Sequence, residues 1–449
     1  MKEKCPRDFA KYTSLNVLGM LGLSCYILAD TFFVSKGLGT NGLAALNLAI
    51  PVYSFIHGSG LMIGMGGGIR YAIEKSQKNH TAANRAFTGT IYLAGAFAAI
   101  FMLAGVFLSG TIVSLFGADK SVYDMSKTYL QVILLFAPAF LLNNVLICFV
   151  RNDGAPQLSM AAMIGGSLSN IVLDWVFIFP CRMGIFGAAF ATGLAPIISI
   201  LILSPHLIRR KNQFHLIKCR MEGKVSAVIL SGGVPSLVTE VSSGVVMIVF
   251  NSIILRLEGN VGVAAYGVIA NLSLVIMAIY TGIAQGIQPI VSRGYGKKDI
   301  QAISTILCYA IITMLVLSAA IYTLIFFGAS QIASIFNSEG NVMLQTIASE
   351  GMRLYFIACP FAGFNIILSI YFTAVACPRP AHLVSLLRGF LVIIPMAFLL
   401  AWLGQIRGVW CAFPATEFFV AGVGFLLFLY VKKFKRTQRS SPSENTVGS

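Results

Sequence analysis

The residues most able to do chemistry are a carboxylate and an amide one helical turn apart, Asp174 and Asn170, inside an apolar run at 159–180. A carboxylate in hydrocarbon is costly, so it indicates a functional site with a partner. Asp30 in the first apolar segment and Thr192 in the sixth are the candidate partners. Each lies as far from the predicted outer end of its segment as Asp174 does, at a depth of roughly 8–9 Å. The three are therefore expected to meet.

These four side chains offer oxygen atoms as ligands. Two carboxylates, an amide and a hydroxyl suit a hard cation such as Na+, or a proton shared between the carboxylates. Apolar surroundings and a neighbouring like charge both disfavour the ionised form, which would let the pair load and release a proton. The alternative is that Asp174 has a structural role and satisfies buried backbone or caps a helix end.

Two further acidic residues, Glu240 and Glu417, fall within apolar segments. Glu240 lies five residues after Pro235, whose missing N–H is expected to open the helix locally. A carboxylate beside such a break would bind a cationic substrate or a second ion, unless it is a neutral carboxyl held against another helix. Glu417 has the same alternatives. His57 is interpreted as a packing residue rather than a proton relay.

Composition places these residues in a membrane. Of the 449 residues, 57% are hydrophobic and 11% are charged, which is too apolar for a soluble globular protein and predicts an all-α integral membrane protein. The nine cysteines are scattered without C-x-x-C spacing, so neither disulfides nor a zinc site are expected. No catalytic motif is present, and we expect neither an enzyme nor a cofactor.

Twelve apolar segments are long enough to span a bilayer. They lie at about 13–35, 43–70, 86–110, 125–150, 159–180, 186–208, 226–256, 262–291, 301–328, 345–376, 382–404 and 408–431. With a cytoplasmic N-terminus, the outer side holds few of the 32 basic residues: Lys36, Lys120, Lys127, Arg182, Arg256, Arg353 and Arg407. This asymmetry predicts a multi-pass protein of the cell membrane with both termini cytoplasmic. It also explains the net charge of +16 without nucleic acid.

An internal repeat divides the chain. Gly39-x-x-Gly42-x-Ala44-Ala45 recurs at an offset of 220 as Gly259-x-x-Gly262-x-Ala264-Ala265. Because six segments separate equivalent positions, the halves should have parallel topology and enclose a central cleft. We expect an amino-terminal lobe at 1–215, a carboxyl-terminal lobe at 216–435, each with six helices, and a disordered cytoplasmic tail at 436–449.

Several motifs resemble those of the multidrug and toxic compound extrusion (MATE) family. The resemblance rests on the runs at 29–34, 38–47 and 285–289, together with Asn170-Ile-Val-Leu-Asp174 and Gly187-Ala-Ala-Phe-Ala-Thr192. Within the family the pattern is similar to the MepA-like bacterial branch. The resemblance implies a multidrug efflux antiporter, and hence antibiotic resistance. Such a protein exports bulky, often cationic compounds by alternating access in exchange for H+ or Na+.

The resemblance also implies roles for particular residues. A cation or proton site is expected at Asp30, Asn170, Asp174 and Thr192, which would be the Na+ ligands, with Tyr129 and Asn144 on the fourth helix nearby. Candidates for the substrate cleft are Glu240, Asn47, Gln285 and Glu417. The carboxyl-lobe acid pair of other members is incomplete here, because helix 10 offers Asn365 instead of an acid.

The sequence thus predicts an H+- or Na+-coupled antiporter. Its partners would be small cationic, amphipathic molecules and the bilayer, and it would act as a monomer. The alternative in the same superfamily is a flippase or exporter of a lipid-linked or polysaccharide cargo. Such proteins tend to line the cleft with basic residues, and the sequence predicts none at membrane depth.

Overall fold

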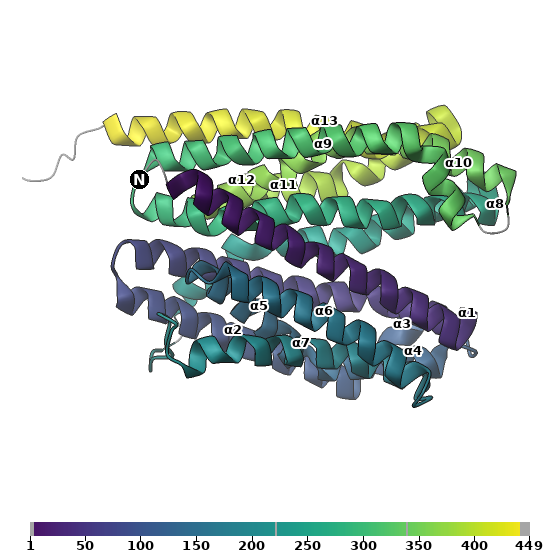
Figure 1. Cartoon of the computed structure of the whole chain (residues 1–449), viewed down its shortest axis with the longest axis horizontal. Coiled ribbons are helices and arrows are strands. Elements are labelled where there is room, and N and C mark those ends of the chain that lie inside the picture. Colours follow the sequence, from purple (N-terminus) through teal and green to yellow (C-terminus); the bar gives the residue numbers. More distant parts are fainter. Residues whose placement is uncertain (1–3, 221, 338–339, 441–449) are drawn as a thin grey trace, which may run out of the picture.

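The computed structural model describes residues 4–220, 222–337 and 340–440, and within them it contains helices and no strands (Figure 1). The first half comprises α1 (Lys4–Ser76), α2 (His80–Phe107), α3 (Ser109–Leu115), α4 (Tyr123–Leu135), α5 (Ala137–Asn152), α6 (Pro156–Ile178) and α7 (Gly184–Ile208). The second comprises α8 (Gly223–Gly296), α9 (Ile300–Phe336), α10 (Val342–Tyr355), α11 (Cys359–Ala374), α12 (Pro378–Leu386) and α13 (Ile393–Ser440). A 3-10 turn, Phe356–Ala358, and a π-helical turn, Leu387–Leu391, interrupt the second half. The all-α prediction is confirmed.

The longest helices fold back on themselves. The 73 residues of α1 would extend about 110 Å as one rod, far more than a bilayer of about 30 Å can hold. Gly39 breaks α1 with φ 68° and ψ −159°, and Gly259 breaks α8 with φ 63° and ψ −155°. Only glycine adopts this backbone region readily. The two glycines that mark the repeat in the sequence are therefore the reversal points of equivalent helices, and Figure 1 shows the return of α1.

Other equivalent positions share a backbone conformation. Lys78 and Lys298, 220 residues apart, have φ of 63° and 57°. The next residues, Asn79 and Asp299, cap α2 and α9, and each side chain accepts a hydrogen bond from the backbone N–H three residues on. The short turn between two long helices is thus built in the same way in both halves.

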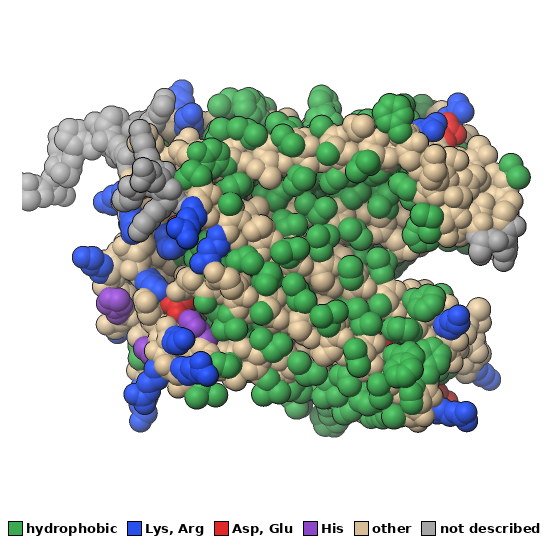
Figure 2. Space-filling model, viewed as in Figure 1, with side chains coloured by type: hydrophobic (Ala, Val, Ile, Leu, Met, Phe, Trp, Pro, Cys, Tyr) green, Lys and Arg blue, Asp and Glu red, His purple; other side chains and the backbone are tan. Residues whose placement is uncertain are grey.

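The surface fits a bilayer. Eight helices of the described chain are long and apolar enough to cross one, and the α4–α5 pair, bent by 47°, makes a ninth if it is one span. Figure 2 shows hydrophobic side chains over the middle of the molecule, with basic side chains gathered at the end where the N-terminus lies. Apolar side chains facing outward are stable in hydrocarbon and would be costly in water.

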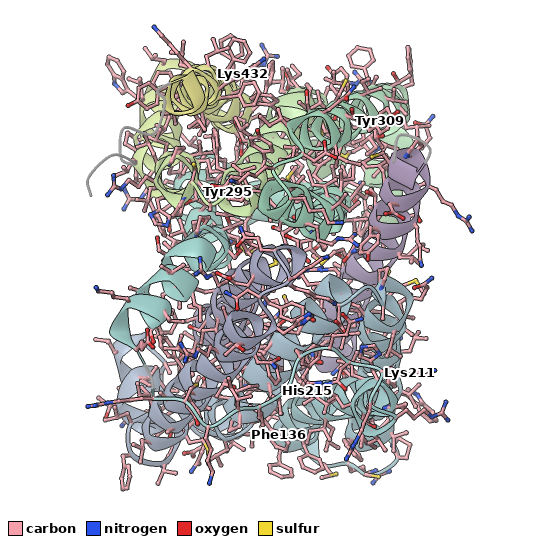
Figure 3. The ribbon with its side chains drawn as sticks, turned by 90° about the vertical axis from the view of Figure 1, so that its left-hand side faces the viewer. Phe136, Lys211, His215, Tyr295, Tyr309 and Lys432 are labelled. Atoms are coloured by element: carbon pink, nitrogen blue, oxygen red, sulfur yellow. The ribbon has the colours of Figure 1, made fainter. Side chains whose placement is uncertain are left out.

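Two large hydrophobic cores hold the helices together, one for each half of the described chain, and a smaller third cluster around Phe372 lies in the second half. Figure 3 views them along the helices, with Tyr295, Tyr309 and Lys432 on the upper bundle and Lys211 and His215 on the lower. One end of the first helix of each half also contacts the core of the other half. Phe9 and Val17 of α1 pack on the second core, whereas Ile229 and Val234 of α8 pack on the first.

The connection between the halves, at 209–222, lies along the first bundle. The His215 N–H donates to the Asn84 side chain at 2.9 Å, and the Ile217 N–H donates to Thr88 Oγ1 at 3.1 Å. Both acceptors belong to α2. These bonds satisfy backbone donors that this non-helical segment cannot pair internally.

At the end where the N-terminus lies, polar side chains join the two halves. Arg151 of α5 is fully buried and donates to Asn16 Oδ1 at 2.7 Å and to Gln285 Oε1 of α8 at 2.8 Å. The amides of Asn152 and Gln288 exchange hydrogen bonds at 3.1 and 3.2 Å. This end of the molecule is therefore closed. At the opposite end, Figure 2 shows a hollow between the two bundles.

Two local predictions need correction. α8 runs through Pro235, and the break expected there does not occur, because its conformation is non-helical only at Gly259. The proline leaves the Ser231 carbonyl without its helical donor, and His382 Nε2 bonds that oxygen at 2.6 Å. The expected disordered tail begins too early, since α13 continues to Ser440; residues 441–449 lie outside the described chain.

The close packing of α1 against α8 at the closed end can be tested at a glycine. A Cβ at Gly286 would lie 2.7 Å from Thr13 Cα and 3.0 Å from the Tyr12 carbonyl oxygen, and neither backbone atom can move freely. Gly286→Ala should therefore lower stability by about 1–3 kcal/mol. A Cβ at Gly244, in the same helix, meets nothing within 4 Å. Gly244→Ala should raise stability by about 0.5–1 kcal/mol. Thermal denaturation of both variants in detergent measures the difference, and equal effects would contradict the close packing.

Candidate cation site

The structure brings Asp30 of α1 and Asp174 of α6 together in the first bundle. The two carboxyl groups lie close enough to interact directly, and the residues are 7% and 0% exposed. Two carboxyl groups at this distance in a buried site cannot both be ionised without a compensating cation. The pair therefore needs a proton or a bound cation.

Asn170 and Thr192 complete the cluster predicted from depth. Asn170 is one turn before Asp174 on α6, and Thr192 lies on the adjacent α7; both are buried. In the amide orientation that satisfies both ends, Asn170 donates to Asp174 Oδ2 at 3.1 Å and accepts from the Thr192 N–H at 3.3 Å. The Thr192 hydroxyl donates to the Ala188 carbonyl at 3.0 Å. Asn170 thus fixes the position of Asp174 relative to α7.

Tyr129 reaches the same cluster from α4. It is 3% exposed, lies beside Thr192, and interacts electrostatically with Asp30 and Asp174. α4 ends at Leu135 and meets α5 at the 47° bend. Four helices therefore contribute oxygen atoms to one buried site.

The donor set favours a hard monovalent cation or a proton. Oδ1 of Asp30 and Oδ1 of Asp174 are buried and accept no hydrogen bond. A buried carboxylate oxygen without a donor is costly, so each can accept a proton or coordinate a cation. No group of three or more His, Cys, Asp or Glu side chains that would hold a metal occurs in the described chain. The ligands present fit Na+ better than a transition metal.

A cavity lies beside this cluster, between α1, α5, α6, α7 and the second stretch of α8. Its lining includes Tyr26, Tyr53, His57, Asn144, Thr192 and Gln285. Asn144, which the resemblance places near the ion, lines this cavity and donates to the Phe140 carbonyl at 3.2 Å. Because Thr192 both lines the cavity and bonds within the cluster, the two sites are contiguous.

Sequence reasoning missed Tyr26 and Tyr53, whose hydroxyls are 2.5 Å apart on the cavity wall. Tyr26 is four residues before Asp30 and interacts with it electrostatically. This i, i+4 spacing puts Tyr26 and Asp30 on one face of the helix, so the sequence could have indicated that Tyr26 lies near the acid. The sequence gives no such indication for Tyr53, because it lies after the reversal at Gly39 and meets Tyr26 only in the folded chain.

The four cleft candidates have different surroundings. Glu240 is partly exposed and faces His57 across 3.7 Å. Gln285 lines the cavity and accepts the hydrogen bond from Arg151. Asn47 is exposed and is not part of the cavity lining.

Glu417 is 1% exposed and already paired. Its Oε1 accepts from Arg388 Nη2 at 2.8 Å and Nε at 3.1 Å, and its Oε2 accepts from Asn365 Nδ2 at 2.6 Å. The sequence placed Arg388 at the inner membrane surface, and a buried partner for Glu417 was not expected. Asn365, at the position where the resemblance implies an acid, binds a carboxylate from another helix. This neutral network holds α11, α13 and the π-helical turn together.

The comparison with known families agrees with this arrangement. The MatE family model matches residues 17–176 and 235–399, which together are more than half of the chain. This chain belongs to the MATE family. The two matched stretches correspond to the two halves of the MATE chain, and the first includes both Asp30 and Asp174.

Relatives of this MATE protein match it along nearly their whole length. The multidrug export protein MepA of Staphylococcus saprophyticus is 24% identical, over 94% of this chain and 92% of its own. An outward-facing structure of a multidrug resistance MATE transporter has a TM-score of 0.89 at 24% identity and covers 96% of each chain. A MOP superfamily transporter from Pyrococcus furiosus has a TM-score of 0.88 at 23% identity, covering 94% of this chain and 95% of its own. These structures establish the shared MATE fold.

The carboxyl pair should reduce stability. Asp174→Asn replaces one of two adjacent buried acids with an amide of the same shape, which removes the like charge and part of the desolvation cost. We expect the melting temperature in Na+-free detergent at pH 8 to rise by about 2 °C or more. Asp124→Asn, an exposed acid on α4, is the control and should change it little. A lower melting temperature for Asp174→Asn alone would mean that the carboxylates do not oppose each other.

Proposed function

We propose that this protein is a cation-coupled multidrug exporter that moves organic cations out of the cell in exchange for H+ or Na+. The observation that carries the proposal is the pair of buried, adjacent carboxyl groups, Asp30 and Asp174, next to a cavity. Membership of the MATE family and similarity to MepA support the transport class. No cofactor is required beyond the coupling ion.

We propose twelve membrane spans arranged as two parallel six-helix lobes, at 1–215 and 216–435. The reversals at Gly39, Gly259 and Gln405 support this number, because each divides one long helix into two spans. The equivalent turns at Lys78 and Lys298 support a duplicated unit. The separate hydrophobic cores support two bodies that can move relative to each other.

The topology is proposed from charge. The end that carries the N-terminus also carries most basic side chains (Figure 2), which supports a cytoplasmic location for both termini in the cell membrane. The contacts of Arg151 and Asn152 with α8 close that end. This supports an outward-facing state, and we propose that the protein acts as a monomer.

Coupling requires that the ion and the substrate prefer different states. Binding of H+ or Na+ to Asp30 and Asp174 removes their mutual repulsion and lets α1 pack more closely against α6. Because Thr192 lies in both the cluster and the cavity lining, that movement changes the cavity. Coupling needs the ion and the substrate to differ by several kcal/mol in their preference between the states, while the ion gradient supplies the driving force.

The cleft favours a cation with apolar groups. Tyr26, Tyr53 and Phe140 line the cavity, and such rings stabilise organic cations. Glu240 supplies a carboxylate at the edge of the cavity, where it faces the lining residue His57. The lining contains neither lysine nor arginine in the part of the chain that the structure describes.

A second candidate is a flippase or exporter of an anionic lipid-linked or polysaccharide cargo. The observation that favours it is Arg151, a fully buried guanidinium that bonds to neutral side chains. In an inward-open state this charge would face the cleft. The anionic-cargo function ranks second because Arg151 does not line the present cavity.

The proposal is tested by dye export from proteoliposomes, with a Na+ gradient and a pH gradient imposed separately. Asp30→Asn and Asp174→Asn should each reduce gradient-driven efflux of a cationic dye by roughly tenfold or more, because neither can cycle the ion. Asp124→Asn is the control, and insertion into liposomes is measured for every variant. Near-normal efflux by both variants would refute the ion site, and export of an anionic lipid-linked glycan instead of the dye would favour the second candidate.

A further inference from the structure

His57 and Glu240 form a contact between the two halves of the molecule. His57 lies in the stretch of α1 after Gly39, and Glu240 lies in the stretch of α8 before Gly259. Nδ1 of His57 is 3.7 Å from Oε2 of Glu240. The helices approach closely here, since a Cβ at Gly58 would lie 3.0 Å from Glu240 Cβ. Any relative movement of the halves must change this contact.

The imidazole is held in a defined orientation. Its ring stacks on Tyr53, with centroids 5.9 Å apart and an interplanar angle of 12°. Tyr53 is fixed in turn by the hydrogen bond of 2.5 Å to Tyr26 and by an edge-to-face contact with Phe140. His57 is therefore positioned on the cavity wall, with its side chain 14% exposed, while that of Glu240 is 33% exposed.

Few other groups can set the charge of this pair. The titratable side chains that share the cavity wall with His57 are Tyr26 and Tyr53 of α1 and Cys148 of α5. From α8, Glu240 faces His57 directly, while Gln285 in the lining is neutral. Asp30 interacts with Tyr53 from beyond the tyrosine pair. Glu240 is thus the charged group in direct contact with the imidazole.

We propose that His57 is an internal competitor for the carboxylate that receives the cationic group of the substrate. When protonated, its imidazolium pairs with Glu240 and occupies the position that an organic cation would take. When neutral, it leaves the carboxylate available and offers an aromatic face together with Tyr53. The inference rests on the proposed function, because it requires a cationic substrate.

The competition predicts a pH effect with a definite sign. Histidine changes charge between about pH 5 and 8, so acidification fills the contact with imidazolium and weakens binding of a permanent cation. For a partly exposed ion pair, the loss of affinity should be about threefold to fivefold. A neutral substrate has no competing charge and should show no effect that depends on His57.

The test is binding of tetraphenylphosphonium to the purified full chain at pH 5.5 and pH 8, without an ion gradient. His57→Gln should abolish the part of the pH dependence that histidine causes, although loss of the aromatic face should lower the affinity at both pH values. His57→Phe retains the aromatic face beside Tyr53 and should abolish the same pH dependence, which guards against misfolding of one variant. His80→Gln is the matched control, because His80 is exposed at the start of α2 and should leave the wild-type profile unchanged.

The outcomes are distinguishable. If both His57 variants keep the wild-type ratio of affinities between the two pH values, the competition is overturned and the exporter function stands. If Glu240→Gln binds the probe at pH 8 as tightly as wild type, the assignment of the receiving carboxylate is wrong. If wild type binds the probe at neither pH, the proposed cationic substrate is wrong and this inference fails with it.

Discussion

The structure depends on the burial of two carboxyl groups at one point inside an apolar bundle. Asp30 and Asp174 come from helices distant in sequence, and their approach requires α1 to pack on α6 along its first stretch. Asn170 supplies the hydrogen bonds that keep the cluster ordered, and Tyr129 packs beside it. Each polar group in this position is costly to bury without partners, so the two carboxyl groups can lie side by side only with a proton or a cation.

The contact between the two halves is not a rigid one. Glycines and buried amides join the halves at one end, so the contact between them is made by close packing and a few hydrogen bonds. Two bodies joined in this way are expected to move relative to each other, unlike bodies joined by a large hydrophobic interface. By contrast, Glu417 and Arg388 form a paired network within the second half. The charged groups of the two halves therefore have different roles. The carboxyl pair of the first half can change its protonation or bind a cation, whereas the ion pair of the second half holds helices together.

Much of this could be predicted from sequence, for identifiable reasons. Hydropathy indicates helices directly, and the depth argument placed Asp30, Asp174 and Thr192 at one level because helices have a fixed rise. The reversal at Gly39 was visible as a repeated motif. What the sequence did not predict depends on contacts between distant helices. Examples are the pairing of Arg388 with Glu417, the satisfaction of the Ser231 carbonyl by His382, and the approach of Tyr53 to Tyr26.

The crossing of the first helix of each half has a consequence for how the chain is put together. Phe9 and Val17 pack on the second core, and Ile229 and Val234 pack on the first, while Val34 and Ile254 of the same two helices belong to the core of their own half. Each half therefore keeps its own core and lends only one end of a helix to the other. Two fragments produced by a cut in the segment at 209–222 would each retain a packed bundle and would expose the apolar surface that the other half normally covers.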